Sequence, residues 1–274
     1  MPARPCKQRG RAGFTLIELL VVLAIISVLG CLLLPAMAKT RIRTTGAGCL
    51  NNLKQMMVGW SMYKDDNNDV LLSNGPGGAV GWNGYGVEDW FNANVNTNPI
   101  PYLNGFLAPY VNNHIELYRC PGDVIPSANG QRIRSYSMNS QMGTTQGGTY
   151  NPGWRFYLKG SDLTCPAPQS AWIFAEESMY SLNDGLLQMN LNAPDYPDVP
   201  GSYHDGACGI SFADGHVELH KWMWVKLPSY GLPNVPYIYG VINNGAHWPS
   251  AAQDVDWVWL RARSACKNGQ QSVN

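Results

Sequence analysis

Residues 13–38 read GFTLIELLVVLAIISVLGCLLLPAMA and carry the strongest signal in the chain. From Leu19 to Ala38 this stretch holds 20 residues without a charge. A helix of that length spans about 30 Å, the thickness of the hydrocarbon core of a bilayer. We therefore expect a transmembrane helix near the N-terminus. The run alone leaves open a buried core helix, or a secretory signal with a small-residue cleavage site at 36–38.

The six residues from Gly13 to Glu18 give the run a more specific meaning. Their sequence, GFTLIE, is followed directly by LLVVLAII. This string resembles the class III leader of type IV pilins and type II secretion pseudopilins. The resemblance implies that residues 1–13 form a leader, that a prepilin peptidase cuts between Gly13 and Phe14 on the cytoplasmic side, and that the new Phe14 amine is methylated. It also implies that Pro35 kinks the helix.

Glu18 is the single acid at the edge of this apolar segment. A carboxylate in an apolar run costs a few kcal/mol at mid-membrane and is rarely kept without a partner. The resemblance implies that the partner is the Phe14 amine of a neighbouring subunit in a filament. The alternative is that Glu18 lies near the membrane interface and extends its carboxylate to water.

The overall charge excludes one broad class of protein. The chain has 19 Lys and Arg residues and 19 Asp and Glu residues, so its formal net charge is zero. A general nucleic-acid binder normally has a basic excess, and we expect no nucleic-acid partner. No nucleotide-binding loop, internal repeat or enzyme constellation is predicted. The chain is therefore expected not to be an enzyme.

The helical pattern continues beyond the apolar run. One stripe has apolar residues at steps of four and three: Cys49, Leu53, Met56, Trp60 and Tyr63. Turn-forming residues follow at 65–69 and predict the helix end. We predict one helix over 14–66, with a membrane half and an amphipathic half, and a globular head over 67–274. Gly46 and Gly48 are expected to weaken the middle of the helix.

Turn signals dominate the head, and strands are short. Alternation predicts a strand at 134–139, and an apolar run predicts a buried central strand at 171–177. The fold class predicted is α+β: a pilin-like long N-terminal helix packed on a loop-rich antiparallel β-sheet head. Alternation of Trp222, Trp224, Trp257 and Trp259 suggests strands, with core packing preferred to glycan binding.

The dipeptide Asp214-Gly215 lies between two alternating runs and predicts a β-hairpin. Registering the strands on that turn opposes Phe212 to Val217. His204 lies ten residues before Asp214, and this His-x9-Asp-Gly spacing resembles a signature of planctomycete- and verrucomicrobia-type exported prepilin-like proteins. Three further strings carry the same resemblance: CLNN at 49–52, CPGD at 120–123 and YSMN at 136–139.

Candidate metal ligands occur around the predicted hairpin: His204, Asp205, Asp214, His216 and His220. His216 and His220 would lie about 13 Å apart on a strand, too far to reach one ion. A hydrogen bond between His204 and Asp214 that clamps the hairpin is the preferred interpretation, and a metal site is the alternative.

A second candidate metal site lies at the predicted helix end. Asp65, Asn67 and Asp69 resemble the start of a calcium loop, but its glycine and bidentate glutamate are missing. Helix termination is preferred there, and bound calcium, the one cofactor to which the sequence points, is the alternative.

The chain has seven cysteines. Cys6 is lost with the predicted leader, and Cys31 lies in the predicted membrane helix. The other five belong to the exported part, where disulfides form. At most two bridges are expected, and the sequence does not determine the pairing.

These observations predict a structural subunit of a type II secretion or type IV pilus-like filament. It would be a single-pass protein of the inner membrane, with its head exported to the periplasm or cell surface. The expected partners are prepilin peptidase, other pseudopilin or pilin subunits, the inner-membrane secretion platform and membrane lipid. The alternative is a membrane-anchored exported module that binds glycan or protein and does not polymerise.

Overall fold

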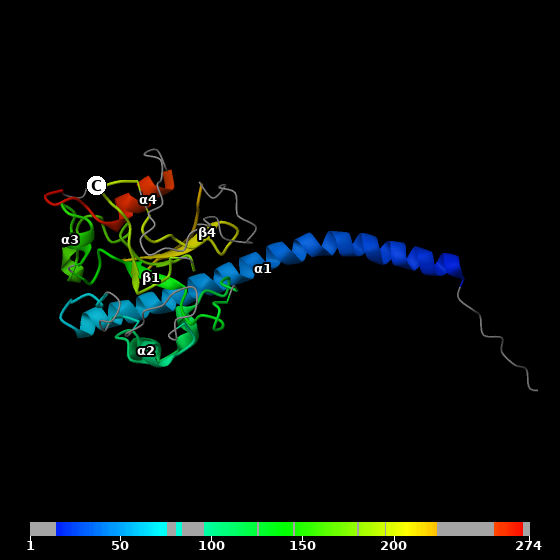
Figure 1. Cartoon of the computed structure of the whole chain (residues 1–274), viewed down its shortest axis with the longest axis horizontal. Helices are drawn as coiled ribbons and strands as arrows, with labels where there is room; N and C mark the ends of the chain where they lie inside the picture. The colour runs from blue at the N-terminus through cyan, green and yellow to red at the C-terminus, as the bar shows by residue number, and fades with distance from the viewer. Residues whose placement is uncertain are drawn as a thin grey trace, which may run out of the picture. The chain divides into compact units, whose positions relative to one another are not determined.

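The chain divides into two compact units, Met1–Arg41 and Ile42–Asn274. Helix α1, Leu16–Asp66, contributes its first part to one unit and its second part to the other (Figure 1). Trp224, one of the four alternating tryptophans, lies outside the described residues. A computed structural model describes these residues: 15–75, 81–83, 96–124, 126–144, 146–179, 181–194, 196–223 and 255–270.

The end of α1 is fixed by polar side chains and by two residues at positive φ. The Asn67 side-chain amide donates to the Tyr63 carbonyl at 2.7 Å, and the Asp69 N–H donates to the Lys64 carbonyl at 3.0 Å. Asn68 and Asp69 have φ values of 53° and 67°, which Asn and Asp tolerate better than most residues. The chain therefore turns away from the helix axis directly after Asp66.

The buried face of α1 in the second unit is the predicted apolar stripe. Cys49, Leu53, Met56 and Trp60 are each at most 2% exposed, and Tyr63 packs against the same core. Full burial of a large apolar side chain contributes roughly 1.5–3 kcal/mol. Together these residues supply a contribution comparable to the whole net stability of a domain.

Glycines on α1 allow the helix to lie very close to the head. A Cβ atom on Gly46 would lie 3.0 Å from Leu219 Cδ1, and one on Gly48 would lie 3.1 Å from Pro121 Cγ. A Cβ on Gly59 would lie 2.9 Å from Leu107 Cδ1. Gly46 and Gly48 both lie within α1. In this structure, these glycines serve close packing.

The head is built on a five-stranded mixed sheet with the strand order β3-β1-β2-β4-β5. The pairs β1–β2, β2–β4 and β4–β5 are antiparallel, and β1–β3 is parallel. The run predicted as the central strand forms β2, and all its residues are buried. This confirms the α+β class. The strands are β1 (Tyr136–Asn139), β2 (Trp172–Glu176), β3 (Leu186–Leu187), β4 (Ala207–Phe212) and β5 (Val217–Lys221).

Helices cover both faces of this sheet (Figure 1). A Cβ on Gly209 would touch Cys49 and Leu53 of α1, whereas the Phe212 ring packs edge-on against Trp259 of α4. Gly209 and Phe212 are three residues apart on β4, so they face opposite sides of the sheet. The remaining elements are α2 (Ile100–Leu103), α3 (Gln146–Tyr150), α4 (Val255–Ser264) and the 3₁₀ helices η2 (Ala108–Val111), η3 (Ile115–Tyr118) and η4 (Gly160–Asp162).

The hairpin β4–β5 exists, but the predicted register is wrong by one residue. Ser211, not Phe212, pairs with Val217. Three residues rather than two form the loop, because the Phe212 N–H donates to the His216 carbonyl at 3.0 Å. Gly215 has φ +88° at the third loop position, which is the pattern of a type I turn followed by a bulge. Val217 therefore shares a face with Ser211, while the His216 ring stacks on Phe212 at 4.2 Å.

The prediction that Trp257 and Trp259 lie on a strand is wrong, because both belong to α4. The correct signal is the arginine four residues after each of them. The Arg261 guanidinium lies 4.9 Å from the Trp257 ring, and that of Arg263 lies 4.2 Å from the Trp259 ring. Residues four apart meet on a helix and not on a strand.

Candidate functional site

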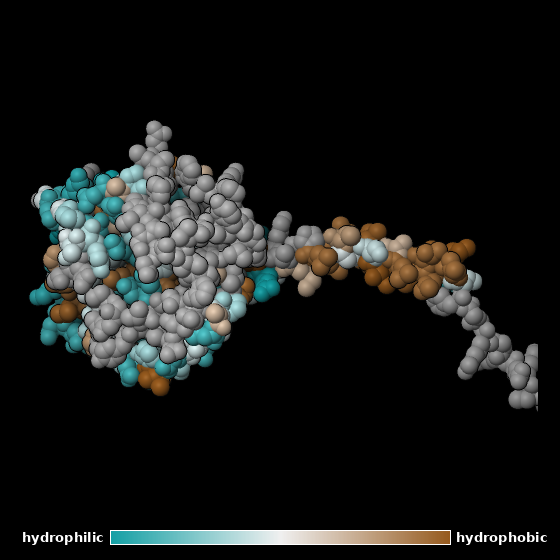
Figure 2. Space-filling model, viewed as in Figure 1, coloured by the Kyte–Doolittle hydropathy of each residue, from teal (hydrophilic) through white to brown (hydrophobic). Residues whose placement is uncertain are grey.

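The first part of α1 has the dimensions and surface of a membrane span. Leu16–Leu34 is 19 residues long, is apolar on all sides and has none of its residues buried in the structure. Figure 2 shows mostly brown, apolar residues along this helix, with a paler patch part-way along it. At 1.5 Å per residue the segment is about 29 Å long, which matches the hydrocarbon core of a bilayer. Within the described residues it is the one helix with this character.

Thr15 and Glu18 form a reciprocal cap at the start of α1. The Thr15 N–H and hydroxyl both donate to Glu18 Oε2 at 2.8 Å, and the Glu18 N–H donates to Thr15 Oγ1 at 3.2 Å. This arrangement is a capping box, in which two free N–H groups at a helix start are satisfied by side chains. Both residues are exposed. Glu18 therefore has a role within its own chain, and one carboxylate edge remains accessible.

The other residues predicted to act in this segment are the processing residues Gly13 and Phe14 and the assembly residue Pro35. Gly13 and Phe14, the residues at the predicted cleavage point, lie outside the described residues. Pro35 lies within α1 and has no N–H to donate to the Cys31 carbonyl. Ser27, the polar residue inside the span, donates its hydroxyl to the Leu23 carbonyl at 2.8 Å. That bond satisfies Ser27 without water, as a lipid environment requires.

In the head, His204 does not pair with Asp214, and the predicted hairpin clamp is wrong. His204 Nε2 lies 2.9 Å from Glu176 Oε1 and 3.2 Å from Cys120 Sγ. Asp214 instead accepts from the His216 N–H at 3.0 Å within its own turn and lies 2.6 Å from His216 Nδ1. Partial burial by itself would raise the pKa of Asp214. The hydrogen bonds from the His216 N–H and ring outweigh burial, so the pKa of Asp214 is lowered. The spacing His-x9-Asp-Gly thus spans two separate local structures.

His204 belongs to a buried cluster of four residues: Cys49, Cys120, Glu176 and His204. Their ligand atoms all lie within 4.8 Å of one another. Cys49 Sγ donates to Glu176 Oε1 at 2.9 Å, and the side chains of all four residues are buried. We call this group the Cys₂-Glu-His cluster. Among the predicted metal candidates, only His204 is part of it.

The electrostatics of the Cys₂-Glu-His cluster disfavour free thiolates. Burial raises the pKa of the Cys49 thiol to about 12 and raises that of Cys120 well above its usual value. Burial lowers the pKa of His204, but hydrogen bonds with Cys120 and Glu176 outweigh this effect and raise it to about 10. A metal cation beside the sulfur atoms would oppose the penalty on the thiolates.

The structure places the predicted calcium candidates at the end of α1 and gives them protein partners. Asp69 Oδ2 accepts from the Ser161 N–H at 2.8 Å, and Asp65 lies 3.0 Å from the Lys64 ammonium. The Asn67 side chain points its amide nitrogen at the Tyr63 carbonyl. These contacts end the helix and also join its end to η4 at Ser161.

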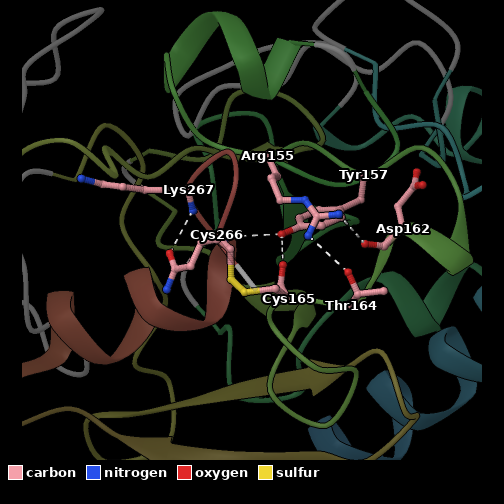
Figure 3. The surroundings of a disulfide bond; sticks show 8 residues. Arg155, Tyr157, Asp162, Thr164, Cys165, Cys266 and Lys267 are labelled. Carbon is pink, nitrogen blue, oxygen red and sulfur yellow. Dashed lines mark hydrogen bonds between the residues drawn. A yellow bond between two sulfur atoms is a disulfide. The ribbon is translucent and has the colours of Figure 1, made fainter. Parts of the chain in front are cut away.

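One disulfide joins Cys165 to Cys266 in the head (Figure 3). Tyr157 links its two ends, since its hydroxyl donates to the Cys165 carbonyl and accepts from the Cys266 N–H at 3.2 Å. The Arg155 N–H donates to the Cys266 carbonyl at 2.9 Å. The bond connects residues 101 positions apart, and disulfides are typical of exported proteins. Cys49, Cys120 and Cys208 are buried free thiols.

Sequence reasoning missed Cys49, Cys120 and Glu176 as neighbours of His204. Cys49 begins the string CLNN, Cys120 begins CPGD, and His204 begins His-x9-Asp-Gly. The three motifs are far apart in the sequence, but in the fold the side chains of their first residues lie next to one another. The shared chemistry of their first residues was the available signal.

Comparison with known proteins points to the N-terminal segment. The family model for the prokaryotic N-terminal methylation motif matches residues 8–30. The match includes the Gly13–Phe14 bond, Glu18 and most of the apolar span. No curated protein sequence and no solved structure matches the chain. The N-terminal segment is therefore similar to that of type IV pilin-like prepilins, and together with the apolar helix it supports a membrane-anchored protein.

Proposed function

We propose that the chain is a structural subunit of a type II secretion or type IV pilus-like filament. Prepilin peptidase removes residues 1–13, and Phe14 becomes a methylated N-terminus in the inner membrane. The observation that carries this proposal is the methylation motif at residues 8–30, joined to an exposed apolar helix of 19 residues. The His-x9-Asp-Gly spacing further suggests the planctomycete- and verrucomicrobia-type exported group.

The filament role follows from the surface of the apolar span. Leu16–Leu34 exposes large apolar side chains all around the helix, so it has no preferred face toward the head. Such a helix is stable in lipid or among copies of itself. Assembly on the secretion platform would transfer it from the first environment to the second, with the heads arrayed outside.

Glu18 supplies the specificity of this assembly. Its carboxylate has a local partner in Thr15, but both residues are exposed in the single chain. In an apolar bundle the methylated Phe14 amine of a neighbour would pair with the carboxylate, and each charge would neutralise the other. A charged pair out of water requires such mutual compensation.

Two substitutions at Glu18 test this assignment. Glu18→Val removes both the charge and the helix cap, whereas Glu18→Gln removes the charge and keeps a side chain that can cap. We expect both variants to be inserted and cleaved, and both to be missing from filaments sheared off the cells or trapped by subunit cross-linking. Assembly of Glu18→Val at the wild-type level would contradict the proposal. Assembly of Glu18→Gln alone would show that the cap, and not the charge, is what the filament needs.

A further inference from the structure

The Cys₂-Glu-His cluster brings together four parts of the head that are distant in sequence. Cys49 lies on α1, Cys120 follows η3, Glu176 is the last residue of β2, and His204 precedes β4. The four residues are at most 4% exposed. In the part of the chain that the structure describes, it is the one group of three or more such side chains whose ligand atoms converge on a single point.

The spacing of the four ligand atoms fits one small ion. The distances from His204 Nε2 to Cys120 Sγ and to Glu176 Oε1 are 3.2 Å and 2.9 Å, and Cys49 Sγ lies 2.9 Å from the same Oε1. A tetrahedral zinc site with bonds of about 2.0–2.3 Å has ligand atoms about 3.3–3.8 Å apart. Shifts of several tenths of an ångström would open these three contacts to that range, and all the separations among the four atoms already lie within 4.8 Å.

Backbone groups around the cluster hold the ligands from outside. The Gly122 N–H donates to Cys120 Sγ at 3.1 Å, and the Gly209 N–H donates to Glu176 Oε2 at 2.8 Å. These bonds leave Oε1 of the glutamate directed at the centre. Outer hydrogen bonds of this kind orient ligands in metal sites. His204 uses Nε2 for the cluster, and its Nδ1 is buried without a hydrogen-bond partner among the described residues.

Two glycines are required for the ligands to approach one another. A Cβ on Gly209 would lie 2.5 Å from Cys49 Sγ, and one on Gly122 would lie 3.0 Å from His204 Cε1. A larger residue at Gly209 would displace Cys49 from the centre. Gly209 lies on β4 between buried neighbours. A glycine at this position therefore leaves room for the Cys49 side chain in the cluster.

We propose that Cys49, Cys120, Glu176 and His204 bind one structural Zn²⁺ that fastens the second part of α1 to the head. Two thiolates, one imidazole and one carboxylate are ligands that zinc takes, and four protein ligands close the site as in structural centres. On binding, the two thiol protons and the Nε2 proton of the His204 imidazolium leave to solvent, and two Zn–S bonds and one Zn–N bond replace the S–H and N–H bonds. The site is buried and has no open position, so it serves folding and not catalysis.

Oxidation of Cys49 and Cys120 to a disulfide is the competing state in an exported head. That state removes the Cys49 donor from Glu176 Oε1, because a disulfide sulfur has no proton to give, and it leaves the Gly209 N–H on Oε2. His204 would then be the carboxylate's remaining partner from these four residues. Zinc instead satisfies all four groups, and a buried carboxylate is costly without such compensation.

Metal analysis of the full-length protein tests the proposal. The chain is extracted in detergent without chelator, and its zinc content and X-ray absorption spectrum are measured. We expect one zinc per chain with two sulfur neighbours at about 2.3 Å and two nitrogen or oxygen neighbours at about 2.0–2.2 Å. Free thiols with no metal, or a Cys49–Cys120 bridge in a non-reducing peptide map, would overturn it. One equivalent of another metal would overturn the choice of zinc.

Variants identify the ligands. Cys120→Ser and His204→Gln are expected to lose the bound zinc. Cys208→Ser is the matched control, because Cys208 is a buried free thiol whose Sγ lies 3.5 Å from the Glu176 carbonyl oxygen. We expect it to keep one zinc. Full zinc in His204→Gln, or loss of zinc from folded Cys208→Ser, would overturn the ligand set. If the ligand variants fail to fold, the sulfur count in the wild-type spectrum decides.

Discussion

The two parts of α1 differ sharply in what their apolar side chains contact. In Leu16–Leu34 the large apolar side chains are 44–74% exposed, whereas Cys49, Leu53, Met56 and Trp60 are at most 2% exposed. The first part is apolar on all sides, and the second part has one apolar stripe. The two parts of this one helix are therefore suited to different environments. The first part has the length and composition of a membrane span, and the second part belongs to the core of the head.

The largest expected effect comes from removing the second part. A chain of residues 67–274 lacks four large buried side chains, which corresponds to roughly 6–12 kcal/mol of lost burial. We expect residues 42–274 to fold as a soluble unit and residues 67–274 not to fold, as judged by cooperative thermal unfolding in circular dichroism. The chain 42–274, which lacks the first part of α1 but keeps the second, is the matched control. Cooperative unfolding of 67–274 would show that the head does not depend on α1.

The next largest difference is expected between a cysteine substitution in the head and one in the first part of α1. Cys165→Ser removes the bridge to Cys266, which closes a loop of 101 residues, and the chain-entropy estimate is about 4.7 kcal/mol of lost stability. Cys31→Ser changes an exposed thiol in the apolar part of α1 and should leave head stability unchanged. Denaturant unfolding of the full-length protein in detergent measures both. Equal stability of the two variants would contradict a structural role for the disulfide.

A pair of alanine substitutions tests the stripe within the second part itself. Leu53 is fully buried and Val58 is 51% exposed on the same helix. Leu53→Ala should cost about 2–5 kcal/mol and Val58→Ala less than about 0.5 kcal/mol in the free energy of unfolding. A comparable loss from both would mean that Val58 is covered by something other than solvent.

The smallest effect is expected at the glycines. A Cβ on Gly59 would meet Leu107 at 2.9 Å, Val111 at 3.1 Å and Tyr110 at 3.3 Å, whereas one on Gly30 would meet nothing within 4 Å. Gly59→Ala should therefore cost about 1–3 kcal/mol through overpacking. Gly30→Ala should leave head unfolding unchanged. Stabilisation by Gly59→Ala would show that helix propensity outweighs the close contact.

The parts of the fold that could be predicted from sequence are those that follow from periodicity. The apolar span, the stripe from Cys49 to Trp60 and the central strand β2 all have local patterns that specify them. The hairpin register could not be predicted, because Asp-Gly fits a two-residue turn as well as a three-residue loop with Gly215 at its end. The spacing of two between Trp257 and Trp259 favours a strand, and the helix is indicated only by Arg261 and Arg263, each four residues after a tryptophan.

The candidate site in the head could be predicted only in part. His204 was identified through its spacing to Asp214, yet its contacts are Cys120 and Glu176, 84 and 28 residues away. Such contacts depend on strand order and on where α1 packs, which local patterns do not encode. The chemistry of Glu18 was recognised from its flanking string. Its cap with Thr15 was also encoded there, in the spacing of T-x-x-E.

The central claim is that this chain is a processed, pilin-like membrane subunit, and its N-terminus tests that claim most directly. Mass spectrometry of the native protein should find a chain that begins at Phe14 and carries a methyl group on its amine. An unprocessed start, or a start after Ala38 at the far end of the apolar run, would contradict it. An unprocessed start would mean that the leader is not cut. A start after Ala38 would mean that the apolar run is a secretory signal and not an assembly helix.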